Sequence, residues 1–136
     1  MHRKNNNFVV KRSNSGLGLF TLKLIAADQR IIEAIGTVLT EEESKKARGK
    51  FLYDLGNNLA LDGSSRDNIA RYINHSCKPN AKAYVSRNRV WIWSLREIKA
   101  GEEITTDYGK EYFDQYIKPK GCKCERCNSK KTRQSK

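Results

Sequence analysis

One stretch of the chain, residues 68–81, reads NIARYINHSCKPNA and is the most specific signal in the sequence. It begins as an apolar run, but Asn74 and His75 interrupt that run where a plain strand would not place polar side chains. A second stretch, residues 96–109, reads REIKAGEEITTDYG, and its segment 103–106 is predicted to be a short strand. Both stretches join polar side chains to short apolar segments, so both are candidates for a functional site.

The rest of the chain predicts a mostly β fold with little helix. The expected strands cover residues 8–11, 17–21, 31–39, 51–55, 58–61, 84–86, 89–93 and 103–106, with turns at 56–57 and 87–88. A capping box formed by Thr40 and Glu43 predicts a short helix to about Arg48, and residues 110–117 are a second helical candidate. The chain shows no alternation of strand, helix and strand, which argues against a parallel nucleotide-binding sheet.

Length and composition fit one small globular domain. The chain has 136 residues, of which 38% are hydrophobic and 31% charged, so one modest core is feasible. No apolar run approaches the roughly 18 residues of a membrane-spanning helix. The first residues, Met1 to Asn5, are not followed by an apolar signal segment. We therefore expect an intracellular protein, either cytoplasmic or associated with a nucleus or nucleoid, that is not secreted.

Positive charge is concentrated at the C-terminal end. The net charge is +12, from 27 basic and 15 acidic residues. Residues 118–136 hold eight basic residues and one acidic residue, which is a net charge of +7. Such a segment attracts nucleic acid through phosphate contacts that do not depend on base sequence. The alternative for residues 129–136 is a solvated, disordered tail that aids solubility.

All four cysteines fit one metal site. Cys122, Cys124 and Cys127 form a C-x-C-x-x-C cluster, and Cys77 lies in the first stretch quoted above. Disulfides are disfavoured, because no export signal is present and a C-x-C pair rarely meets disulfide geometry. Four thiolates satisfy the closed tetrahedral coordination of a structural zinc ion. We therefore expect one structural zinc, with reduced thiols that bind no metal as the alternative.

The glycine pair Gly16 and Gly18 is a weak signal alone, since such pairs also occur in ordinary tight turns. In order with the two stretches and the cysteine cluster, however, it resembles the SET-domain family of protein lysine methyltransferases, with a post-SET zinc segment. The resemblance spans about Phe8 to Cys127 and implies several small sheets around a knot-like core. The implied division is a SET domain over 6–109, a post-SET zinc-binding segment over 110–128 and a basic disordered tail over 129–136.

The resemblance also implies a methyl donor, S-adenosylmethionine, and assigns residues to it. The implied donor-binding residues are Gly16, Leu17, Gly18, Asn74, His75 and Tyr108. Tyr108 matches the catalytic tyrosine of the family. His75 is not expected to be a general base, since the matching histidine contacts the donor largely through its backbone. Tyr53 and Tyr72 are candidate walls of the substrate lysine channel, because aromatic faces can flank a lysine stem; each is an ordinary core aromatic in the alternative interpretation.

Three positions depart from the family pattern. Ala34 stands where many members carry a tyrosine. Thr106, a candidate channel residue, stands where phenylalanine or tyrosine is usual, and its smaller side chain favours di- or trimethylation. The cysteine cluster is shorter than the usual C-x-C-x4-C, which zinc tolerates. Glu102 and Glu103 look like paired carboxylates but are expected to make structural hydrogen bonds in a turn.

The expected function is S-adenosylmethionine-dependent N-methylation of lysine in a basic protein substrate, such as a histone or another nucleic-acid-associated protein. A basic substrate requires a neutral or acidic groove, for which 41–43, Asp62, Asp67 and Glu102 are the candidate acids. The alternative is a catalytically weak SET-like module that binds a peptide or nucleic acid. The expected partners are the protein substrate and, through the basic tail, nucleic acid; the expected assembly is a monomer or a homodimer.

Overall fold

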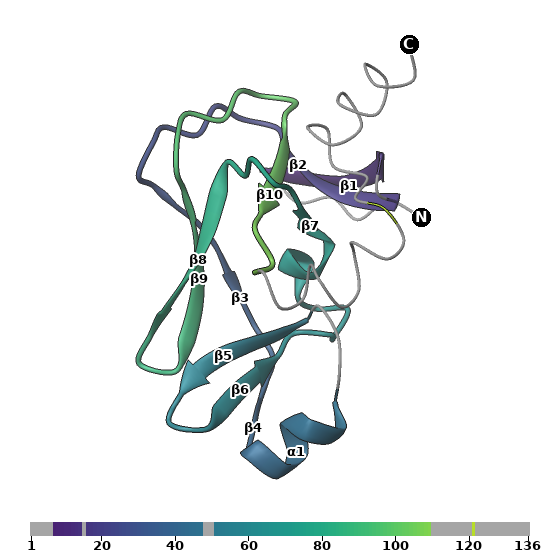
Figure 1. Cartoon of the computed structure of the whole chain (residues 1–136). Coiled ribbons are helices and arrows are strands. Elements are labelled where there is room, and N and C mark those ends of the chain that lie inside the picture. Colours follow the sequence, from purple (N-terminus) through teal and green to yellow (C-terminus); the bar gives the residue numbers. More distant parts are fainter. Residues whose placement is uncertain (1–6, 15, 48–50, 110–120, 122–136) are drawn as a thin grey trace.

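The computed structural model describes residues 7–14, 16–47, 51–109 and 121, which form short strands with little helix (Figure 1). The strands are β1 (Phe8–Ser13), β2 (Gly16–Thr21), β3 (Arg30–Ala34), β4 (Thr37–Leu39), β5 (Leu52–Gly56), β6 (Leu59–Asp62), β7 (Asn74–His75), β8 (Ala81–Ser86), β9 (Arg89–Ser94) and β10 (Glu103–Thr106). The helical elements are α1 (Glu41–Lys46) and the 3-10 turn η1 (Ile69–Tyr72). In the described part of the chain, no helix has the length and apolar character needed to span a bilayer.

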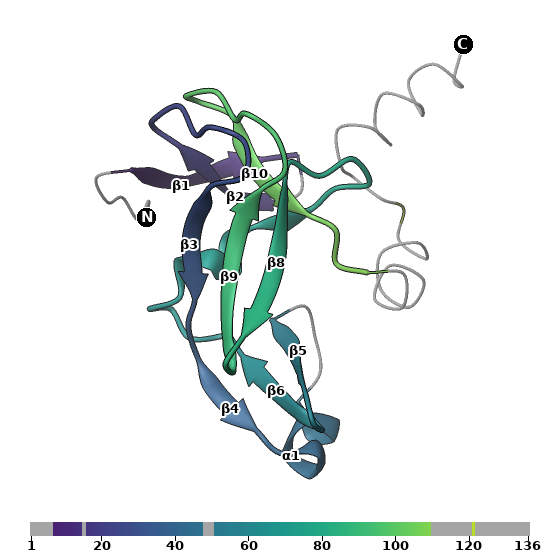
Figure 2. The same ribbon diagram turned by 90° about the vertical axis from the view of Figure 1, so that its left-hand side faces the viewer.

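The strands form three small sheets, as expected from the sequence. Their orders are β1-β2-β10-β7, β3-β9-β8 and β4-β6-β5. The first sheet lies at one end of the molecule and the third, together with α1, lies at the other, with the β3-β9-β8 sheet between them (Figures 1 and 2). The common core contains Leu19, Val90, Ile92 and Ile104, which are at most 1% exposed.

Several local predictions are confirmed. Thr40 caps α1: its hydroxyl accepts a hydrogen bond from the Glu43 amide at 3.2 Å, and the Glu43 carboxylate accepts one from the Thr40 amide at 2.9 Å. The helix ends at Lys46, two residues earlier than predicted. The β8–β9 hairpin turns at Arg87 and Asn88, which both have positive φ angles, as predicted.

Two boundaries differ from the prediction. The β5–β6 hairpin turns at Asn57 and Asn58, one residue later than expected, because these two residues take the left-handed conformation that the tight turn requires. The predicted strand 31–39 is two strands in different sheets, β3 and β4. The chain changes sheet at Gly36, where any Cβ would clash with the Asp62 carbonyl, so close backbone packing ends the first strand.

The two stretches that open the sequence analysis lie side by side. Strands β7 and β10 pair in parallel, with Asn74 opposite Thr105 and His75 opposite Thr106. The Ser76 amide extends the pairing, since it donates to the Thr106 carbonyl at 2.9 Å. This pairing places Asn74, His75 and the segment after β10 next to one another.

Candidate active site

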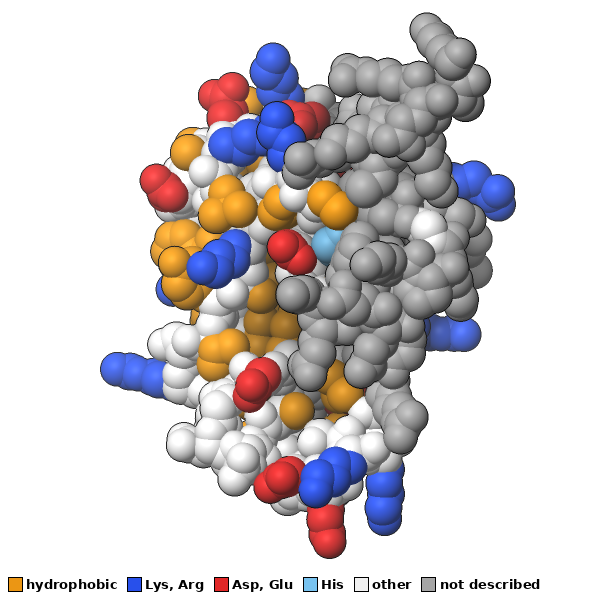
Figure 3. All heavy atoms as spheres, in the orientation of Figure 1, with side chains coloured by type: hydrophobic (Ala, Val, Ile, Leu, Met, Phe, Trp, Pro, Cys, Tyr) orange, Lys and Arg blue, Asp and Glu red, His pale blue; other side chains and the backbone are white. Residues whose placement is uncertain are grey.

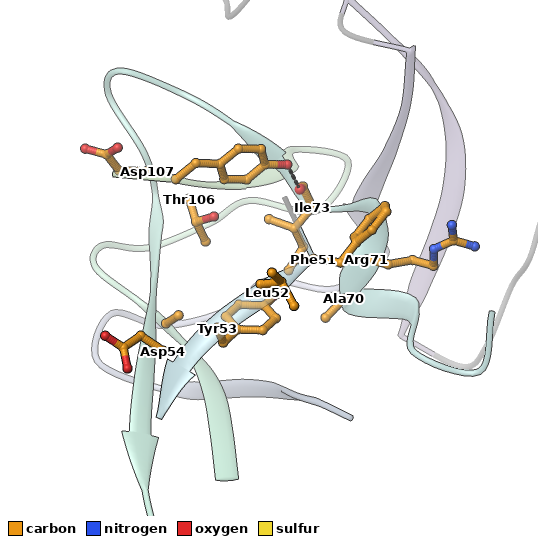
Figure 4. Close-up of a pocket in the computed structure, with 11 residues that line it drawn as sticks. Phe51, Leu52, Tyr53, Asp54, Ala70, Arg71, Ile73, Thr106 and Asp107 are labelled. Atoms are coloured by element: carbon orange, nitrogen blue, oxygen red, sulfur yellow. Dashed lines mark hydrogen bonds between the residues drawn. The ribbon is translucent and has the colours of Figure 1, made fainter. Parts of the chain in front are cut away.

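A cavity of about 270 Å³ lies beside the segment that follows β10 (Figure 4). Four segments form its walls: β5 with Phe51 before it, η1 with Ile73 after it, β8, and the end of β10 with Asp107 and Tyr108 after it. The residues that line it are Phe51, Leu52, Tyr53, Asp54, Ala70, Arg71, Ile73, Ala83, Thr106, Asp107 and Tyr108. Mostly apolar groups therefore surround a space that only the folded chain assembles, and the space-filling view shows hydrophobic side chains at the floor of a hollow in this face (Figure 3).

Tyr108 lies at the wall of this cavity and is held at both ends. Its hydroxyl donates a hydrogen bond to the Ile73 carbonyl, drawn as the dashed line in Figure 4. Its amide donates to Nδ1 of His75 at 3.1 Å, and the rings of the two residues lie 5.4 Å apart. The hydroxyl proton is committed to Ile73, so the lone pairs of the phenol oxygen are the groups it can offer to a hydrogen-bond donor.

His75 has a buried imidazole that supports the backbone. Burial lowers its pKa, an effect that the nearby Asp107 carboxylate, 3.7 Å from Nδ1, opposes. The neutral ring accepts the Tyr108 amide, and its Nε2 lies 3.5 Å from the Cys77 sulfur. His75 does not line the cavity. Its ring therefore holds the Tyr108 amide in place.

Asn74 ties the glycine pair to the same network. Its amide nitrogen donates to the Leu17 carbonyl at 2.9 Å, to the Glu103 carboxylate at 2.8 Å and to the Ser13 hydroxyl at 3.2 Å. A Cβ at Gly18 would clash with the Glu103 carboxylate and press on the Asn74 amide. The predicted donor-binding residues thus form one connected group, in which the absence of a side chain at Gly18 keeps the Asn74 amide in position.

The candidate channel residues differ in whether they line the cavity. Tyr53 and Thr106 both line the cavity, and burial raises the pKa of Tyr53 to about 12, so its phenol stays neutral. Tyr72 does not line it; this side chain packs against the core, and the Arg71 guanidinium lies 5.4 Å from its ring. Both tyrosines also pack against the core cluster, so the structure separates them only by their place at the cavity.

The acidic groups at the cavity are not those predicted. Asp54 and Asp107 line it, and none of the acids proposed from the sequence does. Glu102 makes structural hydrogen bonds, as expected: it accepts from the Lys99 amide at 2.8 Å and pairs with Arg96 at 3.1 Å. Sequence reasoning also missed Phe51, Ala70 and Ala83. Two of these residues lie within the quoted motifs: Asp107 stands next to Tyr108 in the second, and Ala70 lies in the first.

The segment that contains these site residues is similar in sequence to known proteins. Residues 16–109 match the family described as SET domain. The chain belongs to the SET domain family. Its relatives include human histone-lysine N-methyltransferase 2D, which is 33% identical over 140 residues. Histone-lysine N-methyltransferase trithorax of Drosophila virilis is 35% identical over 124 residues, and set-2 of Caenorhabditis elegans is 42% identical over 106.

These matches cover most of the chain but little of each relative. They include 94%, 82% and 68% of this chain, which spans 2%, 3% and 7% of the respective relatives. The similarity therefore applies to the domain that contains the cavity and the network around Tyr108.

Of the departures from the family pattern, Thr106 lines the cavity and Ala34 lies in the core, whereas the short cysteine cluster lies outside the described residues. Ala34 is 1% exposed in the core at the end of β3 and does not line the cavity. Cys77 is half-buried beside His75, whereas Cys122, Cys124 and Cys127 lie outside the described residues, as does the helix predicted over 110–117. Within the described residues no group of three metal-ligating side chains occurs, and Cys77 is the one predicted zinc ligand among them.

Proposed function

We propose that this SET domain is a protein lysine N-methyltransferase that uses S-adenosylmethionine. The observation that carries the proposal is the position of Tyr108, which joins the cavity to the group formed by Gly16, Gly18, Asn74 and His75. The relatives named as histone-lysine N-methyltransferases support the same reaction class. When bound, S-adenosylmethionine supplies a methyl group activated on a sulfonium.

The cavity suits the side chain of a substrate lysine. A lysine with a pKa near 10.4 is neutral in only about one molecule in 2,500 at pH 7, which is an obstacle of about 4.6 kcal/mol. Apolar walls that include Phe51 and Ile73 remove water from the amine and so favour its neutral form. The neutral phenol of Tyr53 adds an aromatic wall without adding a charge.

Tyr108 aligns the amine. Its hydroxyl donates to the Ile73 carbonyl, so the phenol oxygen can accept a hydrogen bond from the substrate N–H through its lone pairs. An amine held in this way points its lone pair along a fixed direction, and such alignment is the main contribution required when the methyl donor is already activated. The His75 ring keeps the Tyr108 backbone in register with β7.

The substrate is a basic protein segment, such as a histone tail. Asp54 and Asp107 at the cavity provide negative charge that attracts basic residues around the target lysine, although the whole chain is strongly basic. Thr106 leaves room at the cavity wall, which favours transfer of two or three methyl groups. The protein would thus work in the nucleus or nucleoid, where such substrates are found.

The C-terminal part completes the proposal. One structural zinc bound by Cys77, Cys122, Cys124 and Cys127 anchors the post-SET segment beside His75, since Cys77 already lies 3.5 Å from that ring. The basic tail contacts nucleic acid without sequence preference.

Donor binding and methyl transfer test the proposal together. Calorimetry with S-adenosylmethionine should detect binding by the zinc-loaded protein, and labelled donor should methylate core histones. Tyr108→Phe should lower methyl transfer by about 100-fold or more while donor affinity stays within a few-fold, because the ring remains and only the aligning hydroxyl is lost. Donor binding without any transfer to histones or other basic proteins would favour the alternative, a SET-like module that binds peptide or nucleic acid.

A further inference from the structure

The outer face of the β3-β9-β8 sheet presents aromatic and basic side chains. On β9, Val90 and Ile92 point into the core and are at most 1% exposed, so Trp91 and Trp93 occupy the opposite face. Tyr84 on β8 lies opposite Trp91 and is 52% exposed. Figure 2 looks onto this sheet, and no described element crosses in front of it.

Cations lie over the rings of this face. The Arg30 guanidinium is 4.2 Å from the centre of the Trp91 ring and 5.7 Å from that of Trp93. Arg89 is 4.9 Å from the Trp91 ring, and Lys82 is 5.2 Å from the Tyr84 ring. Figure 3 shows the edge of this face, where hydrophobic and basic side chains gather beside β8 and β9.

A hollow of about 440 Å³ opens between these side chains. It is lined by Asp28, Arg30, Tyr84, Val85, Ser86, Trp91, Trp93, Ser94 and Leu95. Tyr84 and Trp93 meet edge to face, with ring centres 6.1 Å apart. The hollow therefore has flat apolar walls and a guanidinium plane, which are the surfaces on which nucleobases stack.

The charges of the face favour an anionic occupant. Its basic side chains are Arg30, Lys82, Arg87 and Arg89, and its acidic ones are Asp28 and Glu33. Within the described residues, Arg89 is the one of these four that forms an ion pair, with Glu33 at 2.9 Å. A cationic ligand such as methylated lysine is disfavoured as the occupant, because the rings already have cations over them. A second copy of the face is disfavoured as well, because the arginines of the two copies would repel each other.

We propose that this face, named here the aromatic–basic face and defined by Arg30, Lys82, Tyr84, Trp91 and Trp93, binds single-stranded nucleic acid. The bases stack on the rings of Trp93 and Tyr84 and on the planar guanidinium of Arg30, while Lys82 and Arg87 bind the phosphates. This binding surface belongs to the described sheet and is separate from the basic C-terminal tail and from the cavity beside Tyr108.

Fluorescence anisotropy with a labelled 20-nucleotide single strand, in DNA and RNA form, tests the inference on the full chain. Trp93→Leu and Arg30→Gln should each weaken binding by about 5- to 50-fold, in line with the loss of one stacked base. Lys45→Gln, which removes one charge from an exposed side chain of α1, should change it less than about 2-fold. Tyr84→Leu, at a half-exposed position, serves as the second aromatic variant should Trp93→Leu fail to fold.

Three results would overturn the inference. Binding that responds to Lys130→Gln with Lys131→Gln but not to the variants of the face would assign it to the tail. Polyglutamate that competes as well as the single strand would show plain charge attraction. A dimer in sedimentation that Trp93→Leu dissolves, with unchanged oligonucleotide affinity, would assign the face to a second copy. Donor binding by the same variants should stay unchanged, which keeps the outcome independent of the methyltransferase proposal.

Discussion

At the scale of single residues, Asn74 is the side chain that connects the predicted donor-binding residues to one another. It is 5% exposed, and its amide reaches the carbonyl of Leu17 and the carboxylate of Glu103. Asn74→Ala would leave both acceptors without this donor, which costs about 1–3 kcal/mol of unfolding free energy. We also expect donor affinity to fall at least about 10-fold, measured by calorimetry alongside chemical denaturation.

Asn80→Ala is the matched control for Asn74. The Asn80 side chain is equally buried, donates to the Glu103 carbonyl at 2.8 Å and accepts from the Thr105 amide at 2.9 Å, but it does not reach the glycine pair. Both variants should lose similar stability, and only Asn74→Ala should lose donor affinity beyond it. Equal losses of affinity would reduce Asn74 to a structural role.

Thr106 gives a second prediction at this scale. It is 8% exposed and lines the cavity, so a larger side chain there occupies space that added methyl groups would need. Thr106→Tyr should shift the products toward monomethyl-lysine, as measured by mass spectrometry of a methylated peptide, whereas Thr106→Ser should keep the wild-type product pattern. Di- and trimethylated products from Thr106→Tyr would show that cavity room at this position does not limit the reaction.

At the scale of elements, the sequence predicts the helix and strand boundaries that depend on a short segment alone. The capping box at Thr40 marks the start of α1, and the 103–106 segment is β10 with the same bounds as predicted. The division of 31–39 into β3 and β4 was missed, because the run is rich in β-branched residues on both sides of Gly36, and the packing of Gly36 against the Asp62 carbonyl that ends the first strand forms only in the folded chain.

The residues of the candidate site also differ in whether the sequence around them identifies them. Tyr108 and Asn74 lie within short motifs and could be found from the sequence. Other residues of the cavity, such as Phe51 and Ala83, lie outside both motifs, on separate segments that meet only after folding. Tyr53 and Tyr72 are both aromatic, and the sequence holds nothing that separates the residue that lines the cavity from the one that does not.

The β8–β9 turn yields a prediction for a whole element. Arg87 and Asn88 have φ angles of 53° and 60°, which suit a two-residue turn but are unfavourable for arginine. Arg87→Asn should therefore raise the free energy of unfolding by about 0.5–1 kcal/mol, because asparagine tolerates the left-handed region better. Chemical denaturation measures the change. Arg87→Lys keeps the charge and should give no gain, and equal stability of the two variants would contradict the turn argument.

At the scale of the whole molecule, the chain is strongly basic, whereas its cavity is lined by two carboxylates and one guanidinium, that of Arg71. The chain carries +12, yet Asp54 and Asp107 lie at the cavity, while the aromatic–basic face lies on the outside of the β3-β9-β8 sheet. One domain can thus attract a basic substrate at the cavity and a polyanion elsewhere. The two surfaces would cooperate where basic proteins and nucleic acid occur together.

The proposed zinc site would connect the C-terminal segment to this arrangement. Cys77 lies two residues after the end of β7, and its sulfur is 3.5 Å from Nε2 of His75. Nδ1 of the same ring accepts a hydrogen bond from the Tyr108 amide. If Cys77 shares a zinc with Cys122, Cys124 and Cys127, removal of the metal by a chelator should lower the unfolding temperature and speed amide exchange in residues 74–77 and 105–109. Metal analysis should give one zinc per chain before chelation.

Cys77→Ser separates a structural zinc from adventitious metal. Zinc bound by four thiolates should be retained much less tightly after one ligand is lost, and the variant should reproduce the faster amide exchange of the chelated protein. Lys78→Gln, next to the ligand but unable to bind zinc through its own side chain in either form, should retain the metal. If Cys77→Ser held one zinc per chain as tightly as the unaltered protein does, the four-cysteine site would be refuted. The proposed connection between the C-terminal segment and Tyr108 would then be refuted as well.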